Sequence, residues 1–253
     1  MMKKLKTLIT TIVSMYILFG ILLFVFQRDF MYFPTAKAAH AFQTELFSVD
    51  QETIEVIVLN KGQPHAIIYF GGNGESVVAN APNFNNIYSN HTVYLVNYRG
   101  YGGSTGFPTE ENLYSDAQHI YDTITKRHKN ISVIGRSLGT GVATFLASTR
   151  SIHKMILVTP YDSIQNIAQQ QYPIYPISLL LKDKYRSSNR IKDIKSATLI
   201  ILAEHDTIIP PKSSAQLIKA FPPSQVKVKV IQEADHNTIS YQGEYYYLLQ
   251  RFI

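Results

Sequence analysis

The sequence of 253 residues contains no cysteine. Disulfide bonds, catalysis by a thiolate and metal sites built on cysteine are therefore excluded. The sequence also shows no group of histidine, aspartate and glutamate residues at metal-ligand spacing, so we expect no bound metal and no metallohydrolase chemistry. No motif requires a cofactor of another kind, and we expect none.

Charged residues are scarce, at 17% of the chain, and the basic ones form no block beyond the first six residues. The net charge of +6 is therefore spread over an ordinary basic surface, and no nucleic-acid-binding module is recognisable. We expect no nucleic-acid partner. Internal repeats, low-complexity segments and long linkers are also missing, and a chain that is 45% hydrophobic suits one large globular domain.

The N-terminus holds an uncharged apolar run from Leu8 to Phe26, preceded by Lys3, Lys4 and Lys6. About 20 apolar residues cross the hydrocarbon core of a bilayer as a helix. A cleaved signal peptide would have a shorter apolar region with small residues close behind it, whereas the small residues at 36–39 lie further on. We therefore expect an uncleaved transmembrane anchor.

This anchor divides the chain into two parts. Residues 1–29 form a basic segment and the transmembrane helix (8–26), and residues 30–253 form the globular domain. The N-terminal lysines favour a cytoplasmic N-terminus, which places the domain on the periplasmic, extracellular or lumenal side.

Short apolar, β-branched runs alternate with helical patterns beyond the anchor. This alternation predicts an α/β fold with a mostly parallel central sheet and helices on both faces. Helices are predicted at 113–126, 138–149 and 212–220. The predicted strands are Thr53–Leu59, Ala66–Phe70, Thr92–Asn97, Ile131–Gly135, Met155–Thr159, Thr198–Ala203 and Val226–Gln232.

One interval breaks this rhythm, at about residues 161–194. It is rich in aromatic and aliphatic residues, as in the stretch from Tyr172 to Leu181. Insertions in such folds emerge on the ligand side, so we expect a small cap-like insertion over the site; a longer surface connection packed on the core is the alternative.

The motif Gly135-Arg136-Ser137-Leu138-Gly139 stands directly behind a predicted strand. A serine with glycines two residues before and two residues after it, between a strand and a helix, is the pattern of a nucleophile elbow. The turn is so tight that Ser137 takes strained backbone angles and side chains at 135 and 139 would collide with neighbouring backbone. The motif alone also occurs by chance, so its context decides.

A serine hydroxyl needs a base to remove its proton, and the base needs an orienting acid. Asp206 follows the strand that ends at Ala203, and His236 follows the last predicted strand. The order Ser137, Asp206, His236, each behind its own strand, is that of an α/β-hydrolase, because active groups gather at the carboxyl ends of parallel strands.

Other residues compete for these roles. His205 adjoins Asp206, but sequence neighbours point apart and seldom form the required pair. Asp162 follows a strand and is a possible substitute acid. Asp235 precedes the histidine and is more typical of a solvated turn.

Backbone amides must stabilise the negative oxygen that develops in acyl transfer. One donor is predicted at Leu138, directly after the nucleophile. The second is predicted at Asn73, within the glycine-rich loop from Gly71 to Ser76. This loop lacks the spacing and the lysine of a phosphate-binding loop.

The chain resembles α/β-hydrolase serine hydrolases with a single N-terminal membrane anchor, among them acylglycerol and lysophospholipid hydrolases and protein depalmitoylases. The resemblance rests on the segments at 70–76, 98–109 and 135–141 and on the acid and histidine loops. The oxyanion loop of this family usually begins His-Gly-Asn, whereas this chain has Gly71-Gly72-Asn73. Tyr98, Arg99, Gly100 and Ser104 are expected to brace that loop.

The resemblance and the residues together predict a membrane-anchored serine hydrolase of lipid-like or acyl esters or thioesters. Ser137 would be the nucleophile, His236 the base and Asp206 the orienting acid. A serine peptidase is the alternative enzyme, since the same triad cleaves amides. A catalytically inactive binding or scaffold protein is the alternative from another class, favoured only by the missing oxyanion-loop histidine.

Overall fold

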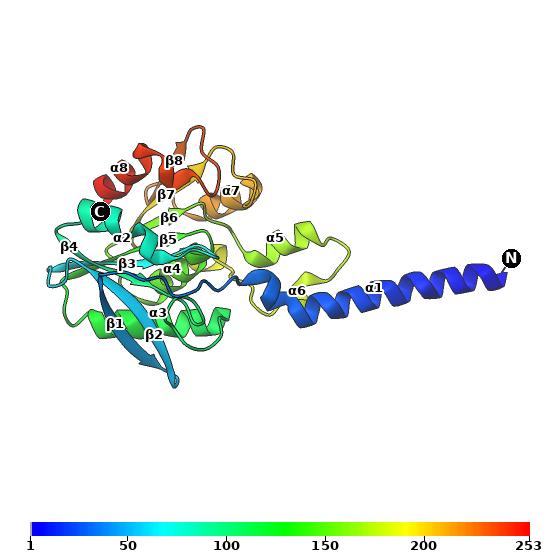
Figure 1. Ribbon diagram of the computed structural model, residues 1–253. Coiled ribbons are helices and arrows are strands. Elements are labelled where there is room, and N and C mark those ends of the chain that lie inside the picture. Colours follow the sequence, from blue (N-terminus) through cyan, green and yellow to red (C-terminus); the bar gives the residue numbers. More distant parts are fainter. Residues whose placement is uncertain (1) are drawn as a thin grey trace.

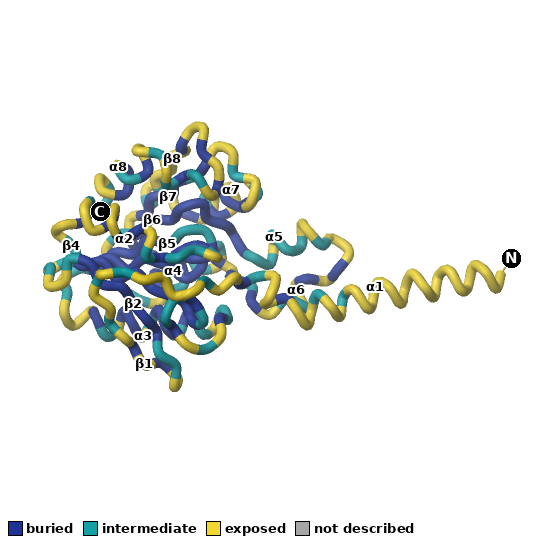
Figure 2. The backbone as a smooth tube through the Cα atoms, in the orientation of Figure 1, coloured by how far each residue is buried: buried dark blue, intermediate teal, exposed yellow. Residues whose placement is uncertain are grey.

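The computed structural model describes residues 2–253 and shows a globular body from which one long helix projects (Figure 1). This helix, α1 (Met2–Met31), is apolar enough to cross a membrane and is a candidate span. Its N-terminal half is exposed along its whole length, and it becomes buried only where it nears the body (Figure 2). A signal sequence would show the same composition.

The body is built on an eight-stranded sheet of order β1-β2-β4-β3-β5-β6-β7-β8. The first two strands pair antiparallel and β2 meets β4 antiparallel, whereas all further pairs are parallel. The bounds are β1 (Gln43–Val49), β2 (Glu52–Leu59), β3 (His65–Phe70), β4 (His91–Val96), β5 (Asn130–Arg136), β6 (Lys154–Val158), β7 (Ala197–Ala203) and β8 (Val226–Ile231).

Helices cover both faces of this sheet, which confirms the predicted fold class. Successive residues of β3 point to opposite faces, so Ile67 packs in one core and Ile68 in the other. One face carries α3 (Glu110–Ile124), α4 (Leu138–Thr149) and α7 (Pro211–Ala220). The other carries α2 (Ala81–Ile87) and α8 (Gly243–Phe252). Single 3-10 turns complete the body at η1 (Val77–Asn80), η2 (Ser188–Asp193) and η3 (Ile239–Tyr241).

Strand β1 and helices α2 and α8 were not among the predicted elements. The first is an edge strand whose residues are half exposed, so it lacks the continuous apolar run that marks the central strands. Helix α2 is short and begins with the sequence Ala-Pro-Asn, which reads as a turn.

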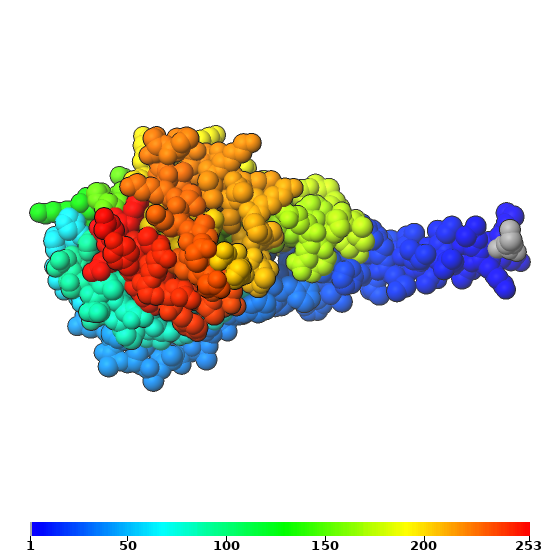
Figure 3. Space-filling view, turned by 90° about the horizontal axis from the view of Figure 1, so that it is seen from above, coloured from blue at the N-terminus to red at the C-terminus, as the bar shows by residue number. Residues whose placement is uncertain are grey.

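The connection from β6 to β7 holds α5 (Ile164–Gln171) and α6 (Ile177–Leu180). These helices lie against α1 rather than on the body alone, as two perpendicular views show (Figures 1 and 3). The insertion leaves the sheet at the carboxyl end of β6, the edge at which Ser137 also lies. The long helix and the insertion therefore both stand at the edge of the sheet where Ser137 lies (Figure 1).

Candidate functional site

Ser137 sits in a sharp turn between β5 and α4. Its backbone angles, φ 49° and ψ −117°, belong to a region that L-residues rarely adopt and that costs about 1–3 kcal/mol. The flanking glycines make the turn possible. A Cβ at Gly139 would lie 2.1 Å from the carbonyl oxygen of Phe70, and one at Gly135 would lie 2.5 Å from that of Gly139. The helix can approach the sheet this closely only because both residues lack side chains.

The turn directs the hydroxyl of Ser137 toward a histidine. Ser137 Oγ lies 2.9 Å from His236 Nε2, and His236 Nδ1 lies 2.9 Å from Asp206 Oδ2. The other oxygen of Asp206 accepts hydrogen bonds from the backbone amides of Ile208 and Ile209, at 2.9 and 2.8 Å. The carboxylate therefore fixes the imidazole with a proton on Nδ1, which leaves Nε2 free to accept the serine proton.

The structure thus brings together the three predicted side chains from the ends of β5, β7 and β8. His236 and Asp206 are largely buried, with side chains 8% and 10% exposed, so water competes little for their hydrogen bond.

The competing residues lie elsewhere. His205 is an exposed residue that faces Glu204 and Glu233. Asp162 is buried and accepts hydrogen bonds from Ser213 and Asn166. Neither touches the chain of hydrogen bonds that begins at Ser137.

The glycine-rich loop after β3 passes beside the serine. A Cβ built at Gly72 would lie 3.6 Å from the Cβ of Ser137, so the next amide, that of Asn73, is close to the nucleophile. Leu138 is the first residue of α4. Within residues 2–253, the amides of Asn73 and Leu138 donate no hydrogen bond, so both are available to a ligand.

The side chain of Asn73 locks this loop onto the segment behind α1. Its Oδ1 accepts from the amide of Phe33, at 2.9 Å, and from the hydroxyl of Tyr101, at 2.7 Å. Its Nδ2 donates to the carbonyl of Met31, at 2.7 Å. The last turn of the long helix is therefore hydrogen-bonded to the loop beside Ser137.

Two largely buried charged residues that sequence reasoning missed, Glu75 and Arg136, connect the loops around Ser137. Glu75 Oε2 lies 3.2 Å from Arg136 Nη1 and accepts from the amide of Gly72, at 2.7 Å. Arg136 Nη2 in turn donates to the carbonyl of His236, at 3.3 Å. This Glu75–Arg136 pair joins the glycine-rich loop, the turn at Ser137 and the loop that holds His236. The only local signal is position, since Arg136 precedes the nucleophile and Glu75 closes the glycine-rich loop.

Tyrosine hydroxyls add neutral donors to the same loop. Tyr69 donates to Glu75, at 2.6 Å, and Tyr98 donates to the carbonyl of Gly71, at 2.7 Å. Burial raises the pKa of both phenols well above the ordinary value, and it raises the pKa of Tyr101 to about 12. All three therefore stay protonated and keep donating at physiological pH. The loop is held even though it lacks the family histidine.

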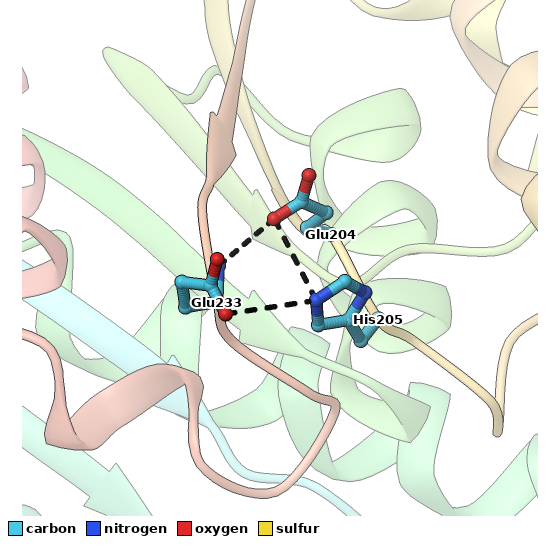
Figure 4. A group of neighbouring side chains, drawn as sticks. All are labelled: Glu204, His205 and Glu233. Carbon is cyan, nitrogen blue, oxygen red and sulfur yellow. Dashed lines mark hydrogen bonds and ion pairs between the residues drawn. The ribbon is translucent and has the colours of Figure 1, made fainter.

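Glu204, His205 and Glu233 form a group that could hold a metal ion (Figure 4). Glu204 follows β7 and Glu233 follows β8, so residues far apart in the sequence meet here, which spacing alone does not reveal. All three are exposed, and Glu233 N donates to Glu204 at 2.9 Å. The group links the acid loop to the histidine loop from the solvent side.

An apolar cavity of about 460 Å³ lies between α1 and the insertion. Its walls are Leu23, Phe24 and Phe30 of α1 and Ile167 and Ala168 of α5, among others. Its volume is that of a small-molecule site. Met31 also lines it, and the Met31 carbonyl is the group that Asn73 binds. One lining residue of the cavity, Met31, is therefore hydrogen-bonded to the glycine-rich loop beside Ser137.

Comparisons with known proteins show the family and the fold of the chain. The family described as "Alpha/beta hydrolase domain" matches residues 91–243, more than half of the chain. An uncharacterized protein of Mycobacterium tuberculosis is 34% identical over 133 residues, which are 51% of this chain and 47% of that protein. The chain thus spans about half the length of this relative.

Two further similarities cover more of the chain. Protein bem46 of Schizosaccharomyces pombe is 25% identical over 259 residues, covering 91% of this chain and 87% of the relative. Among solved structures, an esterase of Pyrococcus furiosus superposes with a TM-score of 0.66 at 16% identity, over 87% of this chain and 96% of that one. The structural likeness supports the fold.

Proposed function

Because this chain belongs to the alpha/beta hydrolase family, we propose that it is a membrane-anchored serine hydrolase that cleaves carboxylic esters or thioesters of acyl or lipid-like substrates. The observation that carries the proposal is the hydrogen-bond chain from Ser137 through His236 to Asp206, with both distances at 2.9 Å. An inactive scaffold would have no need of a strained serine held at this distance from a buried imidazole.

In the first half of the proposed reaction, Ser137 Oγ attacks the acyl carbonyl carbon and its proton passes to His236 Nε2. The amides of Asn73 and Leu138 donate to the negative oxygen of the tetrahedral intermediate. Asp206 stabilises the imidazolium. The intermediate collapses, and the leaving alcohol or thiol takes the proton from His236.

The second half releases the acyl group. Water attacks the carbonyl of the acyl-serine and gives its proton to His236. The carboxylic acid leaves, and the proton returns to Ser137 Oγ. No cofactor takes part in this scheme.

The cavity beside α1 supports an acyl chain as the group that distinguishes substrates. Its walls are mainly aliphatic and aromatic, and they include Met31, whose carbonyl accepts a hydrogen bond from Asn73. An alkyl chain lying there would place its carbonyl end near the oxyanion amides. Burial is worth about 0.8 kcal/mol for each methylene group, so longer chains are favoured until the cavity is full.

The membrane anchor is the second part of the proposal. Helix α1 is uncharged from Thr7 to Gln27, and its first turns, before this stretch, carry Lys3, Lys4 and Lys6. The lysines at 3, 4 and 6 favour an N-terminus in the cytoplasm, so the body faces the periplasm, the cell exterior or a lumen.

Labelling with a fluorophosphonate probe tests the proposed activity. The detergent-solubilised full-length protein should react stoichiometrically, and Ser137→Ala should not react. Ser132→Ala is the matched control, because that serine lies on β5, the strand that leads to Ser137, but is buried in the sheet. Intact protein that ignores the probe as completely as Ser137→Ala does would refute the proposal. Parallel assays with ester, thioester and peptide substrates decide between esterase and peptidase.

A further inference from the structure

The insertion and α1 carry matching uncharged stretches. Residues 164–181 contain no Asp, Glu, Lys or Arg, and neither do residues 7–27. Both stretches end at the same level, because Arg28 of α1 forms an ion pair with Asp183, with Nε and Oδ2 2.9 Å apart. Lys182 lies over the ring of Phe24, 4.7 Å from its centroid. From this charged level the two uncharged segments run side by side (Figures 1 and 3).

The tip of the insertion contacts α1 far from that charged level. The rings of Tyr175 and Tyr16 stack with centroids 4.5 Å apart and planes 1° from parallel. At 1.5 Å of rise per residue, Tyr16 lies about 18 Å along the helix from Arg28. Gly20 allows this approach, since a Cβ there would lie 2.8 Å from the Tyr175 ring.

This contact leaves little of α1 for a bilayer if the insertion stays in water. Only residues 7–15 are uncharged and lie beyond the contact, which is about 14 Å of helix. The hydrocarbon core is about 30 Å thick. We propose that residues 164–181 enter the hydrocarbon layer beside α1, as a second membrane-embedded element. The inference rests on the anchor that is part of the proposed function.

The backbone of the turn between α5 and α6 suits such a location. Hydrocarbon tolerates a non-helical backbone only where its polar groups have partners within the protein. Tyr16 donates its hydroxyl to the carbonyl of Ile174, at 2.9 Å, and Tyr175 donates to the carbonyl of Tyr16, at 2.8 Å. Gln169 Nε2 donates to the carbonyl of Tyr175, at 3.0 Å. Prolines at 173 and 176 remove two amides that would otherwise need acceptors.

Two apolar side chains of the insertion are strongly exposed and unpartnered within the described residues. Ile174 is 69% exposed and Leu179 is 81% exposed. Lipid chains are the occupant that fits, because this surface continues the exposed apolar surface of α1 without a charged boundary. The cavity between α1 and α5 then opens among the acyl chains of the bilayer, and an acyl substrate reaches it without crossing water.

The chain contains no tryptophan, so single tryptophans report depth without background. Three variants are reconstituted in phosphatidylcholine vesicles: Ile174→Trp at the tip, Leu18→Trp on α1 and Tyr241→Trp on the body. Leu18 and Tyr241 are exposed, as Ile174 is, so the three sites are matched. Quenching is measured with lipids brominated in the chains and with water-soluble acrylamide. Labelling of Ser137 by a fluorophosphonate provides a fold check that is independent of lipid.

The tryptophan of Ile174→Trp should behave like that of Leu18→Trp. Its emission should be blue-shifted and quenched by the brominated chains, and its acrylamide quenching constant should be several-fold below that of Tyr241→Trp. If Leu18→Trp is quenched by lipid but Ile174→Trp behaves like Tyr241→Trp, the insertion lies in water and the inference is overturned while the anchor stands. If Leu18→Trp is also open to acrylamide and untouched by bromine, the anchor fails, and the inference fails with it.

Discussion

The proposed catalytic edge of the sheet, where Ser137 lies, and the arm formed by α1, α5 and α6 satisfy their polar groups by different means. At the edge, charged side chains form the connecting bonds. The Glu75–Arg136 pair joins three loops, and Asp206 is hydrogen-bonded to His236. In the arm, hydroxyl and amide groups such as those of Tyr16 and Gln169 bond to backbone carbonyls. Chemistry at Ser137 needs side chains fixed by strong directional bonds, whereas a segment in hydrocarbon needs its polar groups hidden.

The largest contrast should come from removing the nucleophile. Ser137→Ala should lower kcat on a short-chain ester by about 10⁴-fold or more, since a triad without its nucleophile retains only the contribution of binding and the oxyanion hole. Lipid insertion of the arm should not change. The check combines steady-state kinetics with the quenching of a tryptophan at position 174. Residual activity within tenfold of the original protein would remove Ser137 from the mechanism.

Gly139→Ala should damage the catalytic edge through packing alone. The added Cβ would lie 2.1 Å from the backbone oxygen of Phe70, so α4 must move away from the sheet. We expect a loss of about 3 kcal/mol or more in unfolding free energy. Gly243→Ala is the control, because a Cβ there meets nothing within 4 Å. Equal stabilities of the two variants in denaturant titrations would contradict this view of the elbow.

Glu75→Gln tests whether the buried charge pair positions the site. The variant keeps the shape but weakens the bonds to Arg136 and to the amide of Gly72. We expect kcat to fall about 10- to 100-fold with little change in KM, because the oxyanion loop and the elbow lose their common anchor. Glu45→Gln is matched, since Glu45 also pairs with cations but lies on β1. A rise in KM with kcat unchanged would place Glu75 in substrate recognition instead.

Ala168→Phe tests the arm. The larger side chain enters the cavity and should lower the ratio of activity on a hexadecanoyl ester to activity on an acetyl ester by about tenfold, the effect of two methylene groups losing burial. Gln170→Phe, on the exposed side of the same helix, should leave that ratio unchanged. Parallel losses on both esters in Ala168→Phe would mean that the cavity does not hold the acyl chain.

The smallest effect is expected for the ion pair between Arg28 and Asp183, where the uncharged stretches of the arm end. Arg28 is 44% exposed at the side chain, so its pair with Asp183 should contribute less than about 1 kcal/mol in a double-mutant cycle of Arg28→Gln and Asp183→Asn. The exposed pair of Arg150 and Asp122 serves as the reference. A coupling energy of several kcal/mol would show that this pair, and not apolar packing, holds the insertion to α1.

The sequence predicted those parts of the molecule that depend on local patterns. Apolar runs marked the central strands, small residues marked α4 with its observed bounds, and Ser137, Asp206 and His236 each followed a strand. The structure brings these three side chains together, while their roles in catalysis stay predictions. The resemblance to α/β-hydrolases is confirmed by the family match.

Contacts between distant segments could not be predicted in this way. Glu75 and Arg136 lie 61 residues apart, and only the pairing of β3 with β5 brings them together. Tyr16 and Tyr175 lie 159 residues apart and meet because the insertion packs along α1, which neither segment reveals by itself. The edge strand β1 could not be predicted from the sequence, because half-exposed strands lack a continuous apolar run.

The account depends most directly on a covalent acyl group at Ser137. The full-length protein is mixed with a long-chain thioester, quenched in acid within the first turnovers and digested for peptide mass spectrometry. The account predicts the acyl mass on the peptide that contains Ser137, and its disappearance in Ser137→Ala. Continued turnover with an unmodified Ser137, or the acyl group on another residue, would contradict it.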